Sequence, residues 1–282
     1  MLGGHSFISQ LGNDPPASKQ EQYAIVESCL NCGIRWFDTT YQPERVALGE
    51  VLYKLERRAQ ATILAWSFFR NFSANEPVGE PECYRSGHIE LILEQLRTNY
   101  LDCLVVMPVK DPDRNRLQIE LAIEWRKKGY VRSLGLWTAD LAVIEPYQEN
   151  KSFQLAIQPF NITTPPAALT LAACKKIELE TLVTSPFFRG WELERMVAEG
   201  CARGYGDRQE LFQRIADLLL RFSLFHPDVD LVIVGIRKVA WIMRNVESVS
   251  RGALTVDEER WLRRLYAQAQ RRPWWRRLRR FF

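Results

Sequence analysis

A carboxylic acid and a phenol, Asp38 and Tyr41, stand close together in the sequence GIRWFDTTYQPERVALGEVL, which covers residues 33–52. The β-branched and aromatic run before Asp38 is typical of a strand, and the segment after Pro43 has the composition of a helix. We therefore expect the pair in a loop that follows a strand. In a (β/α) barrel such loops form the C-terminal mouth, where active sites lie. An acid and a phenol at this place predict proton-transfer chemistry.

The elements that would position this pair alternate regularly along the chain. Strands are expected at 3–9, 34–37, 62–68, 102–107, 131–137, 153–157, 180–184 and 231–234. Helices are expected at 19–32, 44–58, 86–98, 117–128, 139–149, 166–176, 209–225, 238–250 and, as an extra C-terminal helix, 255–270, with a long loop over 186–207. Eight strands alternating with helices predict an α/β fold, a single (β/α)8 TIM barrel. A doubly wound open sheet is the alternative, but its G-x-G-x-x-G motif is missing after the first strand.

Charge separates the end of the chain from its body. The 282 residues carry a net charge of +4, and the last twelve, RRPWWRRLRRFF, contain six arginines and no acid. Subtracting those six charges leaves −2 for the rest, so nucleic acid binding by the body is not expected. We predict a barrel domain over residues 1–270 and a basic, aromatic tail over 271–282.

The tail has the pattern of an amphipathic helix. Five apolar residues, Trp274, Trp275, Leu278, Phe281 and Phe282, fall within about 120° of arc, and the arginines take the other side. This arrangement favours binding to an anionic membrane surface or to a partner protein through residues 274–282. Nucleic acid binding and a disordered end are the remaining alternatives.

Composition excludes several other classes of protein. No apolar run approaches the roughly 20 residues that span a bilayer, and the N-terminus has no basic segment of the kind that opens a signal peptide. Six scattered cysteines include the pair Cys29 and Cys32, but no second pair or histidine stands at zinc-binding spacing. We expect no metal site and reduced thiols in a cytoplasmic protein, with the periphery of a membrane as the alternative location.

Several motifs, in order, resemble those of the aldo-keto reductases. Beside WFDT and LGEVL in the region of Asp38, they are LRTNYLDCLVV at 96–106, KKGYVRSLGLW at 127–137, QPFN at 158–161, SPFFRG at 185–190 and HPDVDLVIVG at 226–235. The resemblance covers nearly the whole chain. It implies a (β/α)8 barrel, a nicotinamide cofactor and a catalytic set of Asp, Tyr, Lys and His.

Only part of this catalytic set is present. The resemblance assigns the Asp to Asp38 and the Tyr to Tyr41, whereas Ser67 stands at the place of the Lys and Met107 at that of the His. A nearby cation lowers the pKa of a phenol and a nearby carboxylate raises it, so the loss of the Lys leaves Tyr41 a weaker acid. His5, at the end of the first expected strand, is a better substitute acid than Arg70.

The cofactor positions are also partly changed. Trp137 and Thr138 replace the family's Ser-Asn pair, Thr184 replaces its stacking aromatic, and Trp241 and Arg244 stand at two adenosine-side positions. The cofactor-binding residues that the resemblance retains are Gln158, Ser185, Gly235, Arg237, Lys238 and Asn245. The expected cofactor is NADP or NAD, if any is bound.

Three functions follow from this pattern. The losses at catalytic and cofactor positions favour a non-catalytic binding or scaffold protein, with a membrane surface as one place of action. The alternative is an NAD(P)H-dependent oxidoreductase that reduces a carbonyl substrate in a rebuilt active site, with Tyr41 as acid and His5 assisting. A ligand sensor without turnover is the third. The sequence does not identify a substrate.

Overall fold

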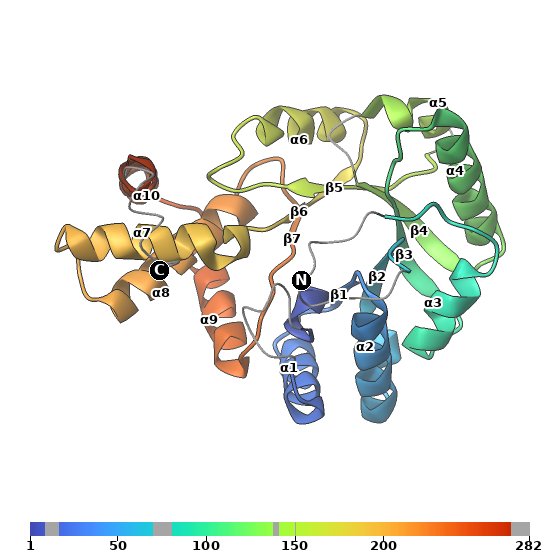
Figure 1. The fold of residues 1–282 in the computed structure, drawn as a ribbon, viewed down its shortest axis with the longest axis horizontal. Helices are drawn as coiled ribbons and strands as arrows, with labels where there is room; N and C mark the ends of the chain where they lie inside the picture. The colour runs from blue at the N-terminus through green and yellow to red at the C-terminus, as the bar shows by residue number, and fades with distance from the viewer. Residues whose placement is uncertain (9–16, 70–80, 138–140, 150, 272–282) are drawn as a thin grey trace, which may run out of the picture.

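A curled parallel sheet forms the centre of the molecule (Figure 1). The computed structural model describes residues 1–8, 17–69, 81–137, 141–149 and 151–271. Neighbouring strands pair in sequence order, and they are β1 (Trp36–Thr39), β2 (Thr62–Trp66), β3 (Leu101–Val106), β4 (Val131–Trp137), β5 (Leu155–Pro159), β6 (Glu180–Thr184) and β7 (Leu231–Val232). The α/β class and the parallel sheet are as predicted from the alternation of strands and helices.

Most helices cover the outer side of this sheet, whereas α7 and α10 lie apart from it and contact α8 (Figure 1). The helices are α1 (Lys19–Asn31), α2 (Gln42–Leu55), α3 (His88–Leu96), α4 (Pro112–Lys127), α5 (Glu145–Gln148), α6 (Ala167–Lys176), α7 (Trp191–Ala202), α8 (Arg208–Leu224), α9 (Val239–Ser250) and α10 (Val256–Gln270). In the described part of the chain, no helix combines the length and the apolar character that a bilayer span requires.

The prediction of the first of the eight strands, over residues 3–9, is wrong. Gly4–Ser6 is a short 3-10 helix (η1), because the Ser6 hydroxyl donates to the Gly3 carbonyl at 2.7 Å and turns the chain. Leu2 forms parallel bridges to Phe37 on one side and to Val234 on the other. Residues 1–3 thus link the two edges of a seven-stranded sheet, in the place where an eighth strand was expected.

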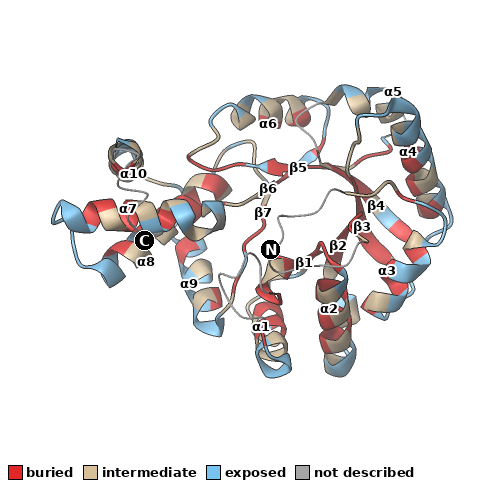
Figure 2. Ribbon diagram, in the orientation of Figure 1, coloured by how far each residue is buried: buried red, intermediate tan, exposed pale blue. Residues whose placement is uncertain are grey.

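The side chains of the strands alternate between two buried layers. Leu64 and Trp66 point into the curled sheet, where they pack with Val105 and Ile157. Ile63 and the other strand residues whose side chains point outward pack against the helices. Figure 2 shows the strands as largely buried, with exposed residues mainly on the outer faces of the helices and in the loops. This alternation decides which side chains reach the interior.

A second helical unit replaces the long loop expected over 186–207. Helices α7, α8 and α10 share a separate apolar core, which includes Leu193, Met196 and Val197 of α7. Gly200 of α7 comes so close to α8 that a Cβ would lie 3.0 Å from a methyl group of Leu211. The apolar spacing of α7 is helical, so the prediction of a loop was wrong.

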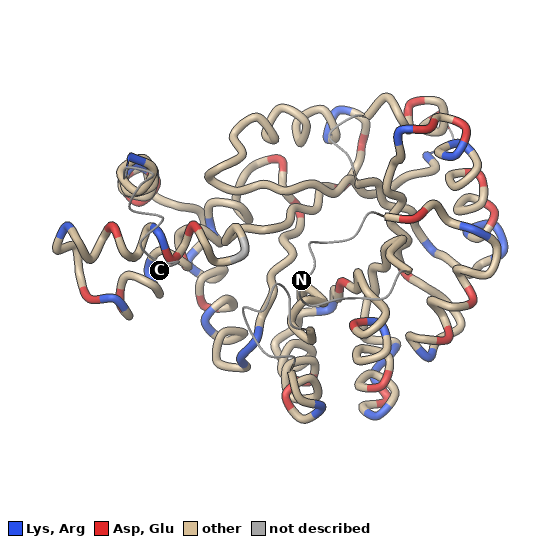
Figure 3. The backbone as a smooth tube through the Cα atoms, viewed as in Figure 1, with Lys and Arg blue, Asp and Glu red and all other residues tan. Residues whose placement is uncertain are grey.

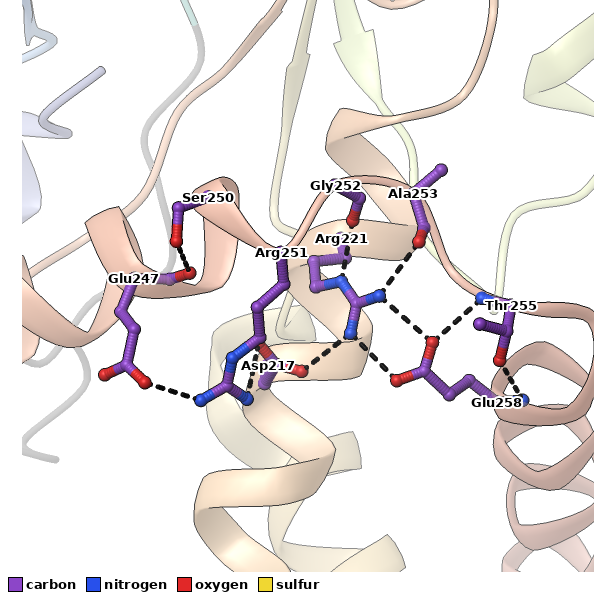
Figure 4. A network of polar contacts seen from close by, with 9 residues as sticks. All are labelled: Asp217, Arg221, Glu247, Ser250, Arg251, Gly252, Ala253, Thr255 and Glu258. Atoms are coloured by element: carbon purple, nitrogen blue, oxygen red, sulfur yellow. Dashed lines mark hydrogen bonds and ion pairs between the residues drawn. The ribbon is translucent and has the colours of Figure 1, made fainter.

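The buried guanidinium of Arg221 joins α8 to α10 (Figure 4). It donates to both carboxylate oxygens of Glu258 at 3.0 Å, to Asp217 at 3.1 Å, and to the carbonyls of Gly252 and Ala253. Helix α10 confirms the expected extra C-terminal helix. The amphipathic tail lies outside the described residues from Arg272 onward.

Candidate active site and cofactor cleft

A cavity of about 1100 Å³ runs from the interior of the sheet to the gap between α8 and α9. Its inner end is lined by His5, Asp38, Trp66, Met107 and Trp137, and its outer end by residues that include Ser185, Gly235, Arg244 and Asn245. Ligand sites are typically concave, mainly apolar and equipped with a few polar groups. The cavity therefore has the size and lining of a site for a large small molecule.

Asp38 is the buried carboxyl group of this cavity. Charged residues lie mainly on the helices and loops (Figure 3). Asp38 differs from them because it belongs to strand β1 and is only 5% exposed. The indole N–H of Trp66 donates to Asp38 Oδ1, and the Gly4 N–H lies 3.5 Å from Oδ2. Burial, reinforced by the nearby Glu44, raises the pKa of Asp38 to about 7. Asp38 therefore changes its charge near neutral pH.

The partner of Asp38 is Trp66 and not Ser67. Trp66 and Phe68 both line the cavity, whereas Ser67 between them is fully buried and faces the phenol of Tyr84 on the opposite side. Among the described residues, the Ser67 hydroxyl makes no hydrogen bond of normal geometry. The predicted place of Ser67 beside Asp38 is thus wrong, because one position along an extended chain reverses the direction of the side chain.

Tyr41 lies behind the cavity wall. Its ring is 4% exposed, packs edge-on against Phe68 at 5.4 Å and is stacked with the His5 ring at 5.7 Å. His5 itself lines the cavity, and Tyr41 does not. The sequence predicted Tyr41 as the acid and His5 as the assisting group. In the structure the histidine, and not the tyrosine, faces the space in which a ligand would lie.

Glu44 holds His5 in this position. Its Oε1 lies 2.8 Å from His5 Nδ1, and its Oε2 accepts hydrogen bonds from the backbone N–H groups of Thr40 and Tyr41 at 2.6 and 3.3 Å. A Cβ on Gly4 would lie 2.2 Å from Glu44 Oε2, so glycine is needed for η1 to approach this closely. Sequence reasoning missed Glu44, whose position in the first turn of a helix suggests an ordinary exposed charge.

Arg45 is a second charged residue that the sequence did not indicate. It is fully buried and donates to the carbonyls of Thr40 and Phe68 at 2.9 and 3.1 Å and to Gln95 at 2.6 Å. Burial lowers the pKa of Arg45 to about 10, which leaves it charged at neutral pH. Through its hydrogen bonds to Thr40 and Phe68, Arg45 connects the loop after β1 with the segment that follows β2.

The predicted cofactor residues fall into two groups. Ser185, Gly235, Arg237 and Asn245 line the cavity, as do Thr184, Trp241 and Arg244, whereas Gln158 and Lys238 do not. The side-chain amide of Gln158 donates to the Ala167 carbonyl at 2.9 Å, and the Lys238 ammonium lies 5.4 Å from the centre of the Trp241 ring. Both side chains are thus engaged elsewhere.

A nicotinamide dinucleotide fits the cavity in size and, in part, in polarity. A Cβ on Gly235 would meet nothing within 4 Å, so the wall is open there. The exposed Arg244 on α9 supplies a cation at the outer end. Arg237, however, donates to the carbonyls of Ser6 and Ile8 at 3.3 and 2.9 Å, and Arg251 is paired with Glu247 and Asp217. The guanidinium of Arg214, which also lines the cavity, lies over the Trp261 ring, so Arg244 and Asn245 are two side chains that could hold a phosphate group.

The sequence matches a known protein family, and the fold is similar to that of solved structures. The model of the aldo/keto reductase family matches residues 2–200. An aldo/keto reductase from Klebsiella pneumoniae in complex with NADP and acetate has a TM-score of 0.69 at 17% identity, covering 94% of this chain and 90% of that one. The holo form of an aldo-keto reductase from Bacillus halodurans has a TM-score of 0.68 at 18% identity, covering 95% and 90%. Comparison with curated protein sequences gives no significant match.

Proposed function

Because the chain belongs to the aldo/keto reductase family, we propose that it is a nicotinamide-dependent oxidoreductase that reduces a carbonyl compound. One observation supports this most directly. A single cavity of about 1100 Å³ joins two proton-transfer groups, the buried Asp38 and the partly exposed His5, to an outer cleft beside α9. NADPH is the first cofactor to test, since solved relatives of the same fold are complexes with NADP and NADPH.

The cofactor, when bound, would supply hydride to a carbonyl carbon, and this chain's residues would arrange the rest. Arg244, Asn245 and the open wall at Gly235 would hold the phosphate-bearing part in the outer cleft. Trp66, Trp137 and the other apolar side chains of the inner end would exclude water and contact the substrate. Two tryptophans in edge-to-face contact at 5.2 Å favour a flat, apolar or aromatic carbonyl compound as substrate.

A non-catalytic binding protein is the second candidate. It is supported by the burial of Tyr41 and by Met107, which lines the inner end without a group that polarises an oxygen. Such a protein would act as a scaffold without a cofactor or, as a sensor, would bind the dinucleotide without turning a substrate over. The membrane and partner roles of the tail are part of the same candidate.

Binding and turnover, measured together, test both candidates. NADPH and NADH are titrated by calorimetry, and benzaldehyde reduction is followed through the absorbance of the reduced cofactor. The Gly235→Leu variant places a bulky side chain in the cleft, and we expect it to weaken NADPH binding at least about tenfold, or about 1.4 kcal/mol. The control is Arg260→Ala, which breaks an exposed ion pair with Asp257 on α10.

The outcomes separate the candidates. Binding with turnover supports the oxidoreductase, and binding without turnover of benzaldehyde or an aliphatic aldehyde supports the second candidate. No binding of either nicotinamide cofactor by the unmodified protein contradicts the oxidoreductase and supports a scaffold that works without a cofactor.

A further inference from the structure

His5 and Glu44 form a paired imidazole and carboxylate at the inner end of the cavity, and we infer that His5 is the proton donor to the substrate oxygen. This inference rests on the proposed reduction of a carbonyl compound. It assigns the acid to His5 in η1, with Glu44 and Tyr41 as positioning residues. Tyr41, expected from the sequence as the acid, does not line the cavity, whereas His5 does.

The geometry fixes one end of the imidazole. Nδ1 lies 2.8 Å from Glu44 Oε1, and the Glu44 side chain is fully buried and held by two backbone N–H groups. A ring oriented by a carboxylate through Nδ1 presents Nε2 at its opposite end. The ring is 34% exposed and lines the cavity, so Nε2 is the nitrogen in reach of a bound ligand.

Charged groups on each neighbouring element act on this imidazole. Glu44 on α2 and Asp38 on β1 carry the negative charges, and Tyr41 covers one face of the ring. Arg237, after β7, holds the carbonyls of Ser6 and Ile8 on either side of Phe7. A carboxylate favours the charged form of a neighbouring imidazole, so Glu44 supports the proton-donating form of His5.

The proton balance of the step is complete. The carbonyl carbon gains a hydride, with its two electrons, from the reduced nicotinamide, and the C=O π bond breaks. The carbonyl oxygen gains the proton from His5 Nε2 and becomes the hydroxyl of the alcohol. The imidazolium of His5 becomes neutral imidazole, which recovers a proton from water.

Benzoate binding tests the assignment without turnover, because a carboxylate needs a cation at the place where the substrate oxygen would lie. Benzoate binding is measured by calorimetry from pH 5 to 9 for the unmodified full chain and for the variants His5→Asn, Tyr41→Phe and Asp38→Asn. The matched control is His226→Asn. His226 lies outside the cavity, and its Nδ1 accepts from the Asp228 N–H, which an asparagine oxygen can replace. Asp38→Asn is included because loss of a proton from Asp38 weakens anion binding over the same pH range.

We expect benzoate to bind the unmodified protein below neutral pH and to weaken on the order of tenfold per pH unit at higher pH. His5→Asn abolishes this binding, whereas Tyr41→Phe, Asp38→Asn and His226→Asn retain a pH-dependent site. In benzaldehyde reduction, His5→Asn lowers kcat about 100- to 10,000-fold and Tyr41→Phe changes it less than about tenfold. Glu44→Gln moves the pH midpoint of kcat to lower pH, a change that loss of packing alone would not cause.

The result distinguishes this inference from the proposed function. His5-dependent benzoate binding without turnover upholds the cationic site and contradicts the oxidoreductase. Benzoate binding and turnover that survive His5→Asn, or that disappear in Tyr41→Phe alone, overturn the assignment of His5. Failure of the unmodified protein to bind benzoate at any pH also overturns it.

Discussion

Two carboxyl groups with contrasting surroundings lie at the inner end of the cavity. Glu44 accepts hydrogen bonds from two backbone N–H groups and faces His5. Asp38 faces an indole N–H and a more distant amide at 3.5 Å, and burial raises its pKa to about 7. Environments that differ in this way give two carboxyl groups different roles in one site. Asp38 is the one that takes up a proton near neutrality.

The raised pKa of Asp38 predicts how the stability of the folded protein depends on pH. Folding raises the pKa of Asp38 from 3.8 to about 7, so the folded state holds the proton more tightly. The contribution of Asp38 is most favourable at acid pH and is lost as the pH rises toward 7. At about 1.4 kcal/mol per pH unit, the loss is at most about 4 kcal/mol. We expect Asp38→Asn to be more stable than the unmodified protein at pH 8, with the gain vanishing near pH 4.

Guanidinium unfolding at pH 4, 6 and 8 measures this difference. Asp113→Asn is a suitable control, because Asp113 is exposed in the first turn of α4. An Asp38→Asn variant that is less stable than the unmodified protein at pH 8 would show that the ionised form is the stabilising one.

The sequence predicted some side chains of the site but not their mutual contacts. Asp38 and Met107 were expected at the cavity, and both line it. Trp66 was missed because the sequence pattern pointed to its neighbour Ser67, and a shift of one residue moves a side chain to the other face of a strand. Glu44 and Arg45 were missed because a sequence does not show which charges on a helix are turned inward.

At the scale of elements, Arg221 connects three segments, which are α8, the loop after α9, and α10. The hydrogen bond from Arg221 lowers the pKa of Glu258 to about 2, so the pair stabilises the fold fully above about pH 4.5 and loses that effect as the pH falls toward 2. We expect Arg221→Met to lower the free energy of unfolding by about 3–5 kcal/mol at pH 7, because it removes the buried guanidinium from Glu258 and leaves Asp217 only its longer ion pair with Arg251.

Chemical denaturation at pH 7 and at pH 3 checks this value. The effect of Arg221→Met is expected to shrink at pH 3. Arg260→Ala, in which only an exposed ion pair is lost, is the matched control and is expected to change stability by no more than about 1 kcal/mol. Equal effects of the two substitutions would contradict the linking role of Arg221.

Most elements were predictable from composition and period, and the exceptions have physical causes. Strand β4 matches its expected range of 131–137, and α10, which a capping box of Thr255 and Glu258 begins, matches the helix expected over 255–270 to within one residue. The segment 3–9 was misread because a side-chain hydrogen bond of Ser6, invisible in the sequence, turns it into η1. Helix α7 was overlooked although Leu193, Met196 and Val197 have helical spacing.

At the scale of the whole molecule, the basic tail remains a sequence-based prediction. Helix α10 ends at Gln270, which gives a natural end for a shortened chain. We expect the full chain to sediment with anionic vesicles and the chain ending at Gln270 not to, because each arginine near an anionic surface contributes about 1 kcal/mol. High salt should weaken this binding without abolishing it, since the aromatic rings also insert.

Neutral vesicles are the control for the electrostatic part. Equal sedimentation of the two chains would exclude a membrane role for the tail. If neither chain sediments, the alternative of a partner protein is the one to pursue.

The contacts of residues 2–6 with the segment that follows the last strand have a consequence for the order of folding. Each strand of the sheet pairs with its neighbour in sequence, so most of the sheet can assemble progressively from nearby segments. The Ile236 N–H, in contrast, donates to the Ser6 hydroxyl across 230 positions. Such distant contacts carry a high loop-closure entropy and tend to form late. His5 lies inside the segment that makes this contact, so the cavity would reach its final form only when the residues after the last strand are in place, and activity would report on completed folding.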